Sequence, residues 1–469
     1  MENNKKIVHL IVFVSLLFLS IIGYLTYFQI FMAADVIDNP YNQRQWARED
    51  NTLRGRIYDR RGTVLAETEV VEGRPRRRYP YNQLYSHVVG YSYKQYGRSA
   101  LEAQYNRELM ALTPESPVAH IKEQLTGDMI QGNDLILTID HEIQRTAEGL
   151  LREKTGSVVV INPGTGEILA MVSKPDFNPN TLMEDWENLA NDERSPLINR
   201  STTGLYPPGS TYKIVMAAAI LEDLHIVDEE YNCTGTINID GYNLSDYGKT
   251  AHGPVDLIQS LVVSCNTNFA RMAVELGGEK VRDTSRRFML DRPLGGDLSI
   301  TQSRFPYGNV IEPTELGAIG IGQGKVLVTP LHMALVASTF INDGVMMEPQ
   351  IIRKIQSPQG RVLETRSPNG NRILSSEIAE EIRDMMVATV ERGTGRRAAL
   401  RGTTVGGKTG TAENATGRSH AWFIGFATRG EDQVAVAVIL ETEGQSGGVA
   451  AAPIAGQIMD IALKRGGEI

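Results

Sequence analysis

The sequence is poor in cysteine and in recognisable metal-binding patterns. Only two cysteines, Cys233 and Cys265, occur in 469 residues, so a disulfide scaffold is excluded, although a single pairing between them is left open. The eight histidines are scattered, and no histidine or cysteine spacing resembles a metal site. We therefore expect no metal and no other cofactor. The net charge of −9 argues against a role in nucleic-acid binding.

Charged residues are also absent from one long stretch near the N-terminus. Between Lys6 and Asp35 there is no Asp, Glu, Lys or Arg, and residues 7–32 are almost wholly apolar. A helix of that length spans a bilayer of roughly 30 Å. Because Lys5 and Lys6 precede it, the positive-inside rule predicts a cytoplasmic tail at 1–6, a single transmembrane helix at 7–32 in the cell membrane, and an extracytoplasmic remainder. The alternative is a signal peptide that is cleaved.

The rest of the chain divides into two parts of different pattern. Residues 33–153 mix charged turns with short strands, and we expect them to form a small membrane-proximal domain that resembles a pedestal or dimerisation domain. Within it, Arg74 to Arg78 most simply forms a solvated charged face, and 97–112 has the pattern of an amphipathic helix. Residues 154–469 begin and end with strand pairs around a long, mainly helical block. This pattern predicts an α+β domain whose two ends share one sheet, closed by a helix from about Pro453 to Lys464.

One short segment carries a chemically suggestive pattern. In Tyr206-Pro-Pro-Gly-Ser-Thr-Tyr-Lys213, prolines and glycine force a turn, and the apolar run that follows is a strong helix former. Ser210 should therefore lie in the first turn of a buried helix, where backbone N–H groups favour negative charge. Lys213 follows three residues later on the same face, so a neutral lysine there could accept the serine proton. Taken alone, this segment favours the simpler interpretation that Ser210 is a helix N-cap.

Two later motifs complete a known order. Ser264-Cys265-Asn266 is a Ser-x-Asn motif, and Lys408-Thr409-Gly410 is a Lys-Thr-Gly motif. The order Ser-x-x-Lys, Ser-x-Asn, Lys-Thr-Gly resembles that of penicillin-recognising serine acyltransferases. Flanking segments extend the likeness over nearly the whole chain to class B penicillin-binding proteins: 54–62, 199–213, 259–266, 321–330, 392–395, 408–413 and 421–426.

This resemblance implies a fold and an activity. The fold would be that of the penicillin-recognising serine acyltransferases, with an antiparallel sheet flanked by helices and an all-helical subdomain. The activity would be that of a monofunctional peptidoglycan D,D-transpeptidase, a serine-type acyltransferase that cross-links stem peptides in cell wall synthesis and is acylated by β-lactams. The sequence favours a small form without appended C-terminal repeats. It does not distinguish a role in cell division from one in elongation and cell shape or in sporulation.

The resemblance also assigns roles to individual residues. Ser210 would be the nucleophile, Lys213 its proton acceptor, Ser264 a proton relay to the leaving nitrogen, and Asn266 a positioning group for the substrate amide and Lys213. Lys408 would keep the site electropositive for a substrate that ends in a carboxylate, which Thr409 and Thr411 would bind. At Gly410 the missing side chain would let a substrate peptide lie against the strand. Backbone N–H groups of Ser210 and Thr411 would form the oxyanion hole.

Partners and rival functions follow from the same resemblance. The expected substrates are stem peptides of lipid-linked precursor strands, and the expected membrane partner is a SEDS-type glycosyltransferase, because this chain has no room for a polymerase of its own. One rival is a hydrolase, a D,D-carboxypeptidase or β-lactamase. The glutamate followed by Leu-Asn that class A β-lactamases place after the second motif is absent here. The other rival is a membrane sensor or scaffold that does not turn over.

Overall fold

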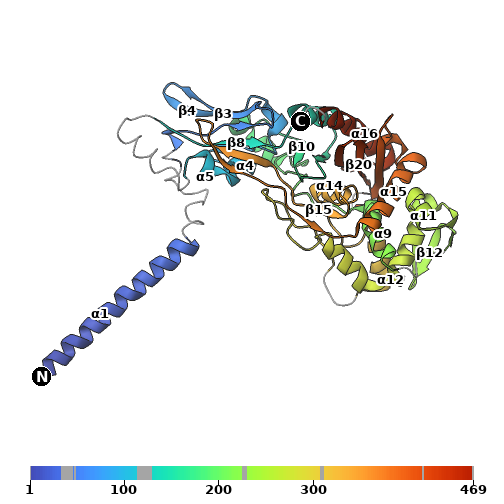
Figure 1. Ribbon diagram of the computed structural model, residues 1–469, viewed down its shortest axis with the longest axis horizontal. Helices are drawn as coiled ribbons and strands as arrows, with labels where there is room; N and C mark the ends of the chain where they lie inside the picture. The colour runs from blue at the N-terminus through green and yellow to red at the C-terminus, as the bar shows by residue number, and fades with distance from the viewer. Residues whose placement is uncertain are drawn as a thin grey trace.

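The structure is a computed structural model that describes residues 2–32, 46, 49–112, 129–223, 230–306, 311–414 and 417–466. Helix α1 (Glu2–Tyr27) continues into a π-helical turn, Phe28–Met32. The side chains from Lys5 to Tyr27 are exposed, and Lys5–Met32 is long and apolar enough to cross a membrane. In Figure 1 this helix extends away from the body of the molecule. The predicted apolar helix is therefore present, with the exposed apolar surface that a membrane anchor requires.

A six-stranded mixed sheet forms the part of the body nearest to α1. Its order is β17 (Val362–Thr365), β16 (Ile352–Gln356), β8 (Asp134–Leu137), β2 (Ile57–Tyr58), β3 (Val64–Val71), β4 (Arg74–Arg78). Only β2 and β8 are parallel; the other neighbours are antiparallel. The sequence placed all of 154–469 in the second domain, yet β16 and β17 lie in this sheet. The two domains are thus joined by strand pairing as well as by the chain itself.

A buried charge cluster holds this first domain together. Glu102 of α4 (Ala100–Gln104) is fully buried and forms ion pairs with Arg54 and with Arg77, whose Nε lies 2.7 Å from Glu102 Oε1. Arg54 also donates to Asn106 Oδ1 at 2.6 Å. The arginine-rich strand β4 is therefore not a uniformly solvated face, because Arg77 turns inward. The amphipathic helix predicted at 97–112 is two short helices, α4 and α5 (Asn106–Leu109), interrupted at Tyr105.

The second domain is built on a five-stranded antiparallel sheet. Its order is β10 (Ile168–Lys174), β9 (Gly156–Ile161), β21 (Asp432–Leu440), β20 (His420–Arg429), β19 (Thr404–Ala412). The register pairs Val158 with Val438, so the first hairpin of the domain lies beside the last one. This confirms that the two ends of the domain share one sheet. Strand β19 lies at an edge, with β20 as its one neighbour in this sheet of the described residues.

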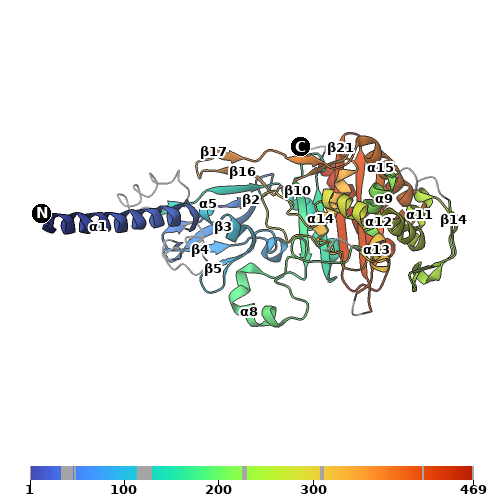
Figure 2. The same ribbon diagram turned by 90° about the horizontal axis from the view of Figure 1, so that it is seen from below.

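Helices cover both faces of this sheet (Figure 2). Val158 and Val160 face a core shared with α7 (His141–Leu151) and α16 (Gly447–Gly466). Their neighbours on β9 face the other core, which contains α9 (Lys213–Leu221) and α14 (Pro330–Thr339). Because the strand is buried on both faces, its residues 158–161 are all apolar although successive side chains point to opposite sides.

The last helix begins earlier than the sequence indicates. We expected a start near Pro453, but α16 begins at Gly447 and Pro453 lies inside it. Proline cannot donate to the carbonyl four residues before it, so the Val449 oxygen loses its helical partner. The Arg397 guanidinium donates to that oxygen at 3.4 Å. The side chain of Arg397, from the 3-10 turn Arg396–Ala398, thus replaces part of the lost helical hydrogen bonding.

The subdomain beyond the sheet is mainly helical. It contains α9, α11 (Leu257–Val263), α12 (Asn266–Arg287) and α13 (Pro313–Gly320), with α15 (Ser376–Arg392) beside them. The expectation of an all-helical subdomain needs a correction, because β11 (Tyr231–Cys233) pairs with β14 (Gly253–Val255), and β12 (Thr236–Ile239) with β13 (Tyr242–Ser245). Asp240 and Gly241, both at positive φ, make the tight turn between β12 and β13. Apart from this addition, the predicted α+β architecture is confirmed.

Shorter elements complete the described structure. They are β1 (Thr52–Leu53), β5 (Ser92–Tyr93), β6 (Gly97–Arg98), β7 (Ile130–Gln131), β15 (Val345–Met347), β18 (Gly370–Arg372), α8 (Leu182–Asn191), and the 3-10 turns at Asn82–Tyr85, Pro179–Thr181, Gly209–Tyr212, Tyr247–Lys249 and Arg396–Ala398.

Candidate active site

The turn that carries Ser210 is fixed from two sides. The 3-10 turn η4 (Gly209–Tyr212) leads directly into α9, as the sequence predicts. Gly209 donates its N–H to the Gly322 oxygen at 2.8 Å, and a Cβ on Gly322 would stand 2.0 Å from the Gly209 oxygen, so this close approach requires glycine. On the other side Trp422 Nε1 donates to the Pro207 oxygen at 3.1 Å. Ser210 is thereby held at a helix start and remains partly exposed.

Lys213 is buried and points to the second motif. Its Nζ lies 2.7 Å from Asn266 Oδ1, 2.8 Å from the Ser264 carbonyl oxygen and 3.3 Å from Ser264 Oγ. Burial lowers the pKa of Lys213 to about 7, against smaller opposing effects of Cys265 and Asp246. Within the described residues the Ser210 hydroxyl makes no hydrogen bond. In this state the amine is thus held by the second motif and is not yet bonded to the serine one turn before it.

The second motif lies between two helices. Ser264 ends α11 in the left-handed region, with φ of 64°, and Asn266 begins α12. A non-glycine residue at positive φ is a strained conformation that the surroundings must enforce. Two hydrogen bonds of the neighbouring Asn266 hold the backbone in this conformation. Its N–H donates to Asp246 Oδ1, and its Nδ2 donates to the Ser245 oxygen at 3.1 Å. Asp246 is therefore a positioning residue that the sequence motifs alone did not indicate.

Lys408 is the second lysine that contacts Ser264. It lies on the edge strand β19, is fully buried, and donates from Nζ to Ser264 Oγ at 2.9 Å and to the Thr409 oxygen at 3.0 Å. Burial holds the pKa of Lys408 well below its usual value, and the positive charge of Lys213 lowers it further. The Ser264 hydroxyl thus lies between two amines, neither of which has a salt-bridge partner among the described residues.

The remaining predicted residues lie along β19. The Thr409 hydroxyl donates to Thr394 Oγ1 at 2.7 Å, and Thr411 is partly exposed. A Cβ added to Gly410 would lie 3.0 Å from the Pro208 oxygen, so this glycine lets the Ser210 turn approach the strand. We expected Gly410 to make room for a substrate peptide. In the structure it makes room for the turn that carries Ser210. Thr394 belongs to the Arg-Gly-Thr-Gly segment at 392–395, to which the sequence gave no role.

The fold therefore gathers the predicted groups from distant parts of the chain. Lys213, Ser264, Asn266 and Lys408 form one hydrogen-bonded network beside the turn of Ser210. A partly exposed hydroxyl next to amines of lowered pKa can serve acyl transfer, because a neutral amine accepts the proton of the attacking hydroxyl. The described residues also include a group of possible metal ligands next to Asn266: Cys233, Asp246, His252 and Cys265.

Comparisons with known proteins agree with this geometry. Residues 156–460 match the model of the penicillin-binding protein transpeptidase domain, and residues 54–135 match the penicillin-binding protein A dimerisation domain. A peptidoglycan D,D-transpeptidase PbpA of Mycolicibacterium smegmatis is 32% identical, over 99% of this chain and 100% of that protein. The second family match covers the region in which the sequence predicted a pedestal or dimerisation domain.

Solved structures give the same result. Penicillin-binding protein A from M. tuberculosis, as a ceftriaxone acyl-enzyme complex, is 30% identical with a TM-score of 0.83, covering 88% of this chain and 99% of that one. A D,D-transpeptidase domain from Eggerthella lenta is 32% identical with a TM-score of 0.81, covering 89% and 100%. This chain belongs to the penicillin-binding protein family with a transpeptidase domain.

Proposed function

We propose that this chain is a peptidoglycan D,D-transpeptidase of cell wall synthesis, which cross-links stem peptides through an acyl-enzyme on Ser210 and is acylated there by β-lactams. The observation that carries the proposal is the network in which Lys213 and Lys408 both donate to Ser264 beside the Ser210 turn. Its support from relatives is direct, because related chains are named D,D-transpeptidases and a structural neighbour is an acyl-enzyme complex.

Acylation begins with attack of the Ser210 oxygen on the carbonyl carbon of the penultimate D-alanine. The serine proton passes to neutral Lys213, whose pKa of about 7 leaves a large fraction uncharged at neutral pH. Ser264, which accepts from both lysines, relays a proton to the departing nitrogen. The C–N bond breaks, the terminal D-alanine leaves as an amine, and the stem peptide stays on Ser210 as an ester.

The developing oxyanion is stabilised by backbone N–H groups of Ser210 and Thr411. Ser210 lies at a helix start, where amide groups have no helical partner. The Thr411 oxygen is 3.2 Å from the Cβ position of Gly209, so the serine turn and strand β19 approach each other closely. An amine of a neighbouring stem peptide then attacks the ester, the new amide forms, and the proton returns to Ser210.

Strand β19 recognises the donor peptide. Since the described sheet gives β19 one neighbour, its other edge has backbone groups available for an added strand. Lys408 makes the end of this strand electropositive, which suits a peptide that ends in a carboxylate. Thr409 and Thr411 bind that carboxylate through their hydroxyl groups. For Thr409 this requires its hydroxyl to give up or share the bond that it makes with Thr394.

The test is the intact mass of the full-length chain in detergent after incubation with a penicillin. We expect an adduct of one antibiotic on the wild type and none on Ser210→Ala. Release of D-alanine from a stem-peptide analogue should then yield a cross-linked product when an amine acceptor is present. Water as the preferred acceptor would identify a hydrolase, and the absence of an adduct on the folded wild type would contradict the enzymatic function.

We also propose that α1 anchors the chain in the cell membrane, with residues 1–6 in the cytoplasm. Lys5 and Lys6 precede the apolar span, which supports that orientation. Protease added to intact spheroplasts should then remove the body of the protein, and full protection would contradict the orientation.

The anchor would pair with a SEDS-type glycosyltransferase. Unchanged association with that enzyme after residues 1–34 are replaced by an unrelated anchor would contradict this pairing.

A further inference from the structure

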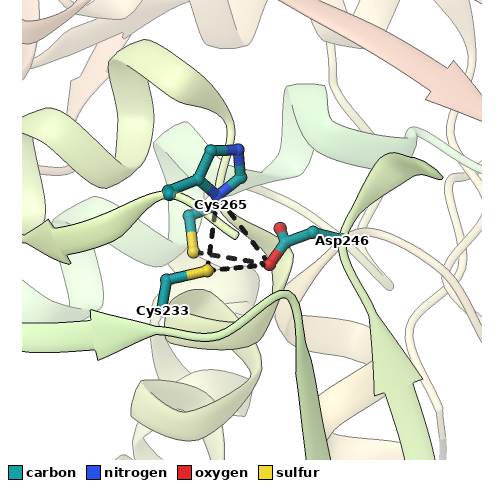
Figure 3. A group of neighbouring side chains, drawn as sticks. Cys233, Asp246 and Cys265 are labelled. Carbon is teal, nitrogen blue, oxygen red and sulfur yellow. Dashed lines mark hydrogen bonds and ion pairs between the residues drawn. The ribbon is translucent and has the colours of Figure 1, made fainter. Parts of the chain in front are cut away.

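Four possible metal ligands converge beside the second motif. Cys233 ends β11, Asp246 follows β13, His252 precedes β14, and Cys265 precedes α12. The one ligand atom that each residue offers lies within 4.8 Å of all the others. Figure 3 shows Cys233, Asp246 and Cys265 pointing toward one another from different elements. The sequence predicted no metal site because the spacing of these residues matches no familiar zinc motif, so this expectation is revised by the fold.

The distances in the cluster match those of a tetrahedral ion. Cys233 Sγ lies 3.2 Å from Asp246 Oδ2 and 3.4 Å from His252 Nδ1. Asp246 Oδ2 lies 3.8 Å from Cys265 Sγ and 3.9 Å from His252 Nδ1. Tetrahedral zinc with bonds of about 2.0–2.3 Å to N, O and S places its ligand atoms about 3.3–3.8 Å apart. The side chains therefore need little movement to surround one ion.

The charge balance of the cluster also favours a cation. The Asp246 side chain is completely buried, and among the described residues its one ion pair is the 3.9 Å contact with His252. The carboxylate accepts hydrogen bonds from Thr267 Oγ1 and the Asn266 N–H, but its buried negative charge still lacks a close cationic partner, which is costly. Both sulfur atoms are buried and unoxidised, so they can become thiolates on binding a metal. Two thiolates, an imidazole and a carboxylate form a closed, soft donor set, which suits Zn²⁺ and not Mg²⁺ or Ca²⁺.

We propose that Cys233, Asp246, His252 and Cys265 bind a structural Zn²⁺ that positions the second motif. Cys265 lies between Ser264 and Asn266 in the chain, and Asp246 accepts the Asn266 N–H through its other oxygen. Zinc would tie the small sheets at 231–255 to the start of α12 and so fix the two side chains that hold Lys213. Zinc binding itself is independent of the proposed transpeptidase function; only its effect on acylation depends on that function.

The first measurement is the metal content of the full-length chain, purified in detergent without a polyhistidine tag or chelator. We expect close to one zinc per chain by elemental mass spectrometry. Cys233→Ser and His252→Ala should contain almost none. Asp240→Asn, in the exposed β12–β13 turn of the same subdomain, is the matched control and should keep the metal. Wild-type protein that is free of zinc and binds none on titration with Zn²⁺ would overturn the proposal, as would a Cys233–Cys265 disulfide in the peptide map.

The second measurement needs no variant, so it holds even if a ligand variant fails to fold. Wild-type protein treated with a chelator should be acylated by a penicillin about ten- to a hundredfold more slowly, because small displacements of catalytic groups have effects of that size. Added Zn²⁺ should restore the rate. An unchanged rate after complete loss of zinc would exclude a positioning role. Failure of acylation with zinc fully bound would contradict the proposed function and leave the metal site standing.

Discussion

Two buried charge clusters in this molecule differ in whether the charges are paired. In the first domain Glu102 lies between the guanidinium groups of Arg54 and Arg77. In the second domain Lys213 and Lys408 lie on either side of the neutral hydroxyl of Ser264. Glu102, Lys213 and Lys408 are all fully buried. The paired charges around Glu102 therefore stabilise the fold, whereas the unpaired amines of Lys213 and Lys408 are suited to proton transfer.

The pKa values express this difference. Burial alone would raise the pKa of Glu102, but the two adjacent arginines hold it below its usual value, so the carboxylate stays charged. Burial lowers the pKa of Lys213 to about 7 and holds that of Lys408 well below its usual value, and no carboxylate restores that of Lys408. A paired cluster keeps its charges fixed and an unpaired one can change them. Only the second behaviour is useful in catalysis.

The largest expected effect comes from removing the unpaired amine next to Ser210. Lys213→Met should lower the rate of acylation by a penicillin by about 10²–10⁴-fold, the usual contribution of a general base. The midpoint of thermal unfolding should stay the same or rise, because an amine without a carboxylate partner leaves the interior. Stopped-flow acylation and calorimetry measure the two quantities. Loss of the folded state together with activity would show that Lys213 is mainly structural.

The opposite outcome is expected in the paired cluster. Glu102→Gln should lower the free energy of unfolding by about 3–5 kcal/mol, because two buried arginines lose their counter-charge. Acylation per folded molecule should not change. Glu380→Gln, which removes an exposed partner of Arg383, is the control and should cost about 0.5 kcal/mol or less. Equal effects of the two variants in chemical denaturation would refute a stabilising role for the buried cluster.

The pH dependence of Glu102 follows from the sign of its shift. Its folded pKa lies below the unfolded value, so its contribution to stability is complete above the ordinary glutamate pKa and is lost as pH falls through the folded pKa. Wild type should therefore lose more stability than Glu102→Gln between about pH 5 and pH 3. Parallel stability curves for the two proteins over that range would contradict the shift.

A smaller effect is expected on the pH profile of acylation. Lys213 is active as a base when neutral, so the rate should rise with pH and level off above a midpoint near pH 7. Asp246 and Cys265 act on the pKa of Lys213 in the opposite sense to burial, and the charge of Lys213 lowers the pKa of Lys408 rather than the reverse. Lys408→Met should therefore leave the midpoint of the profile in place. A midpoint that moves to higher pH would show that Lys408 carries its charge while Lys213 titrates.

The smallest effect is expected at Thr394. Thr394→Val keeps the shape of the side chain and removes the oxygen that accepts the Thr409 hydroxyl. Net hydrogen bonds of this kind contribute about 1 kcal/mol, so KM for a donor peptide should change by less than about tenfold, with kcat nearly constant. Thr203→Val, at an exposed position outside the site, serves as the control. A large fall in kcat would instead place Thr394 in the chemistry itself.

The local parts of this site are encoded within short stretches of the sequence. Ser210 and Lys213 are three residues apart at a helix start, and the prolines, the glycine and the apolar run that set this geometry are all within one short segment. The alternation in β9 and the hairpin after it are likewise encoded in neighbouring residues. The order of the three motifs indicated the family, and with it the sheet shared by both ends of the second domain.

The remaining features depend on contacts between distant segments and are visible in the fold alone. Three such contacts join segments that are distant in sequence. Asp246 fixes Asn266, strands β16 and β17 enter the first sheet, and Arg77 turns toward Glu102. The four proposed zinc ligands come from separate elements with no recognisable spacing. Hydrogen-bond periodicity and turn chemistry act over a few residues, so the sequence expresses them directly. Which distant side chains share one buried volume depends on the packing of the whole chain.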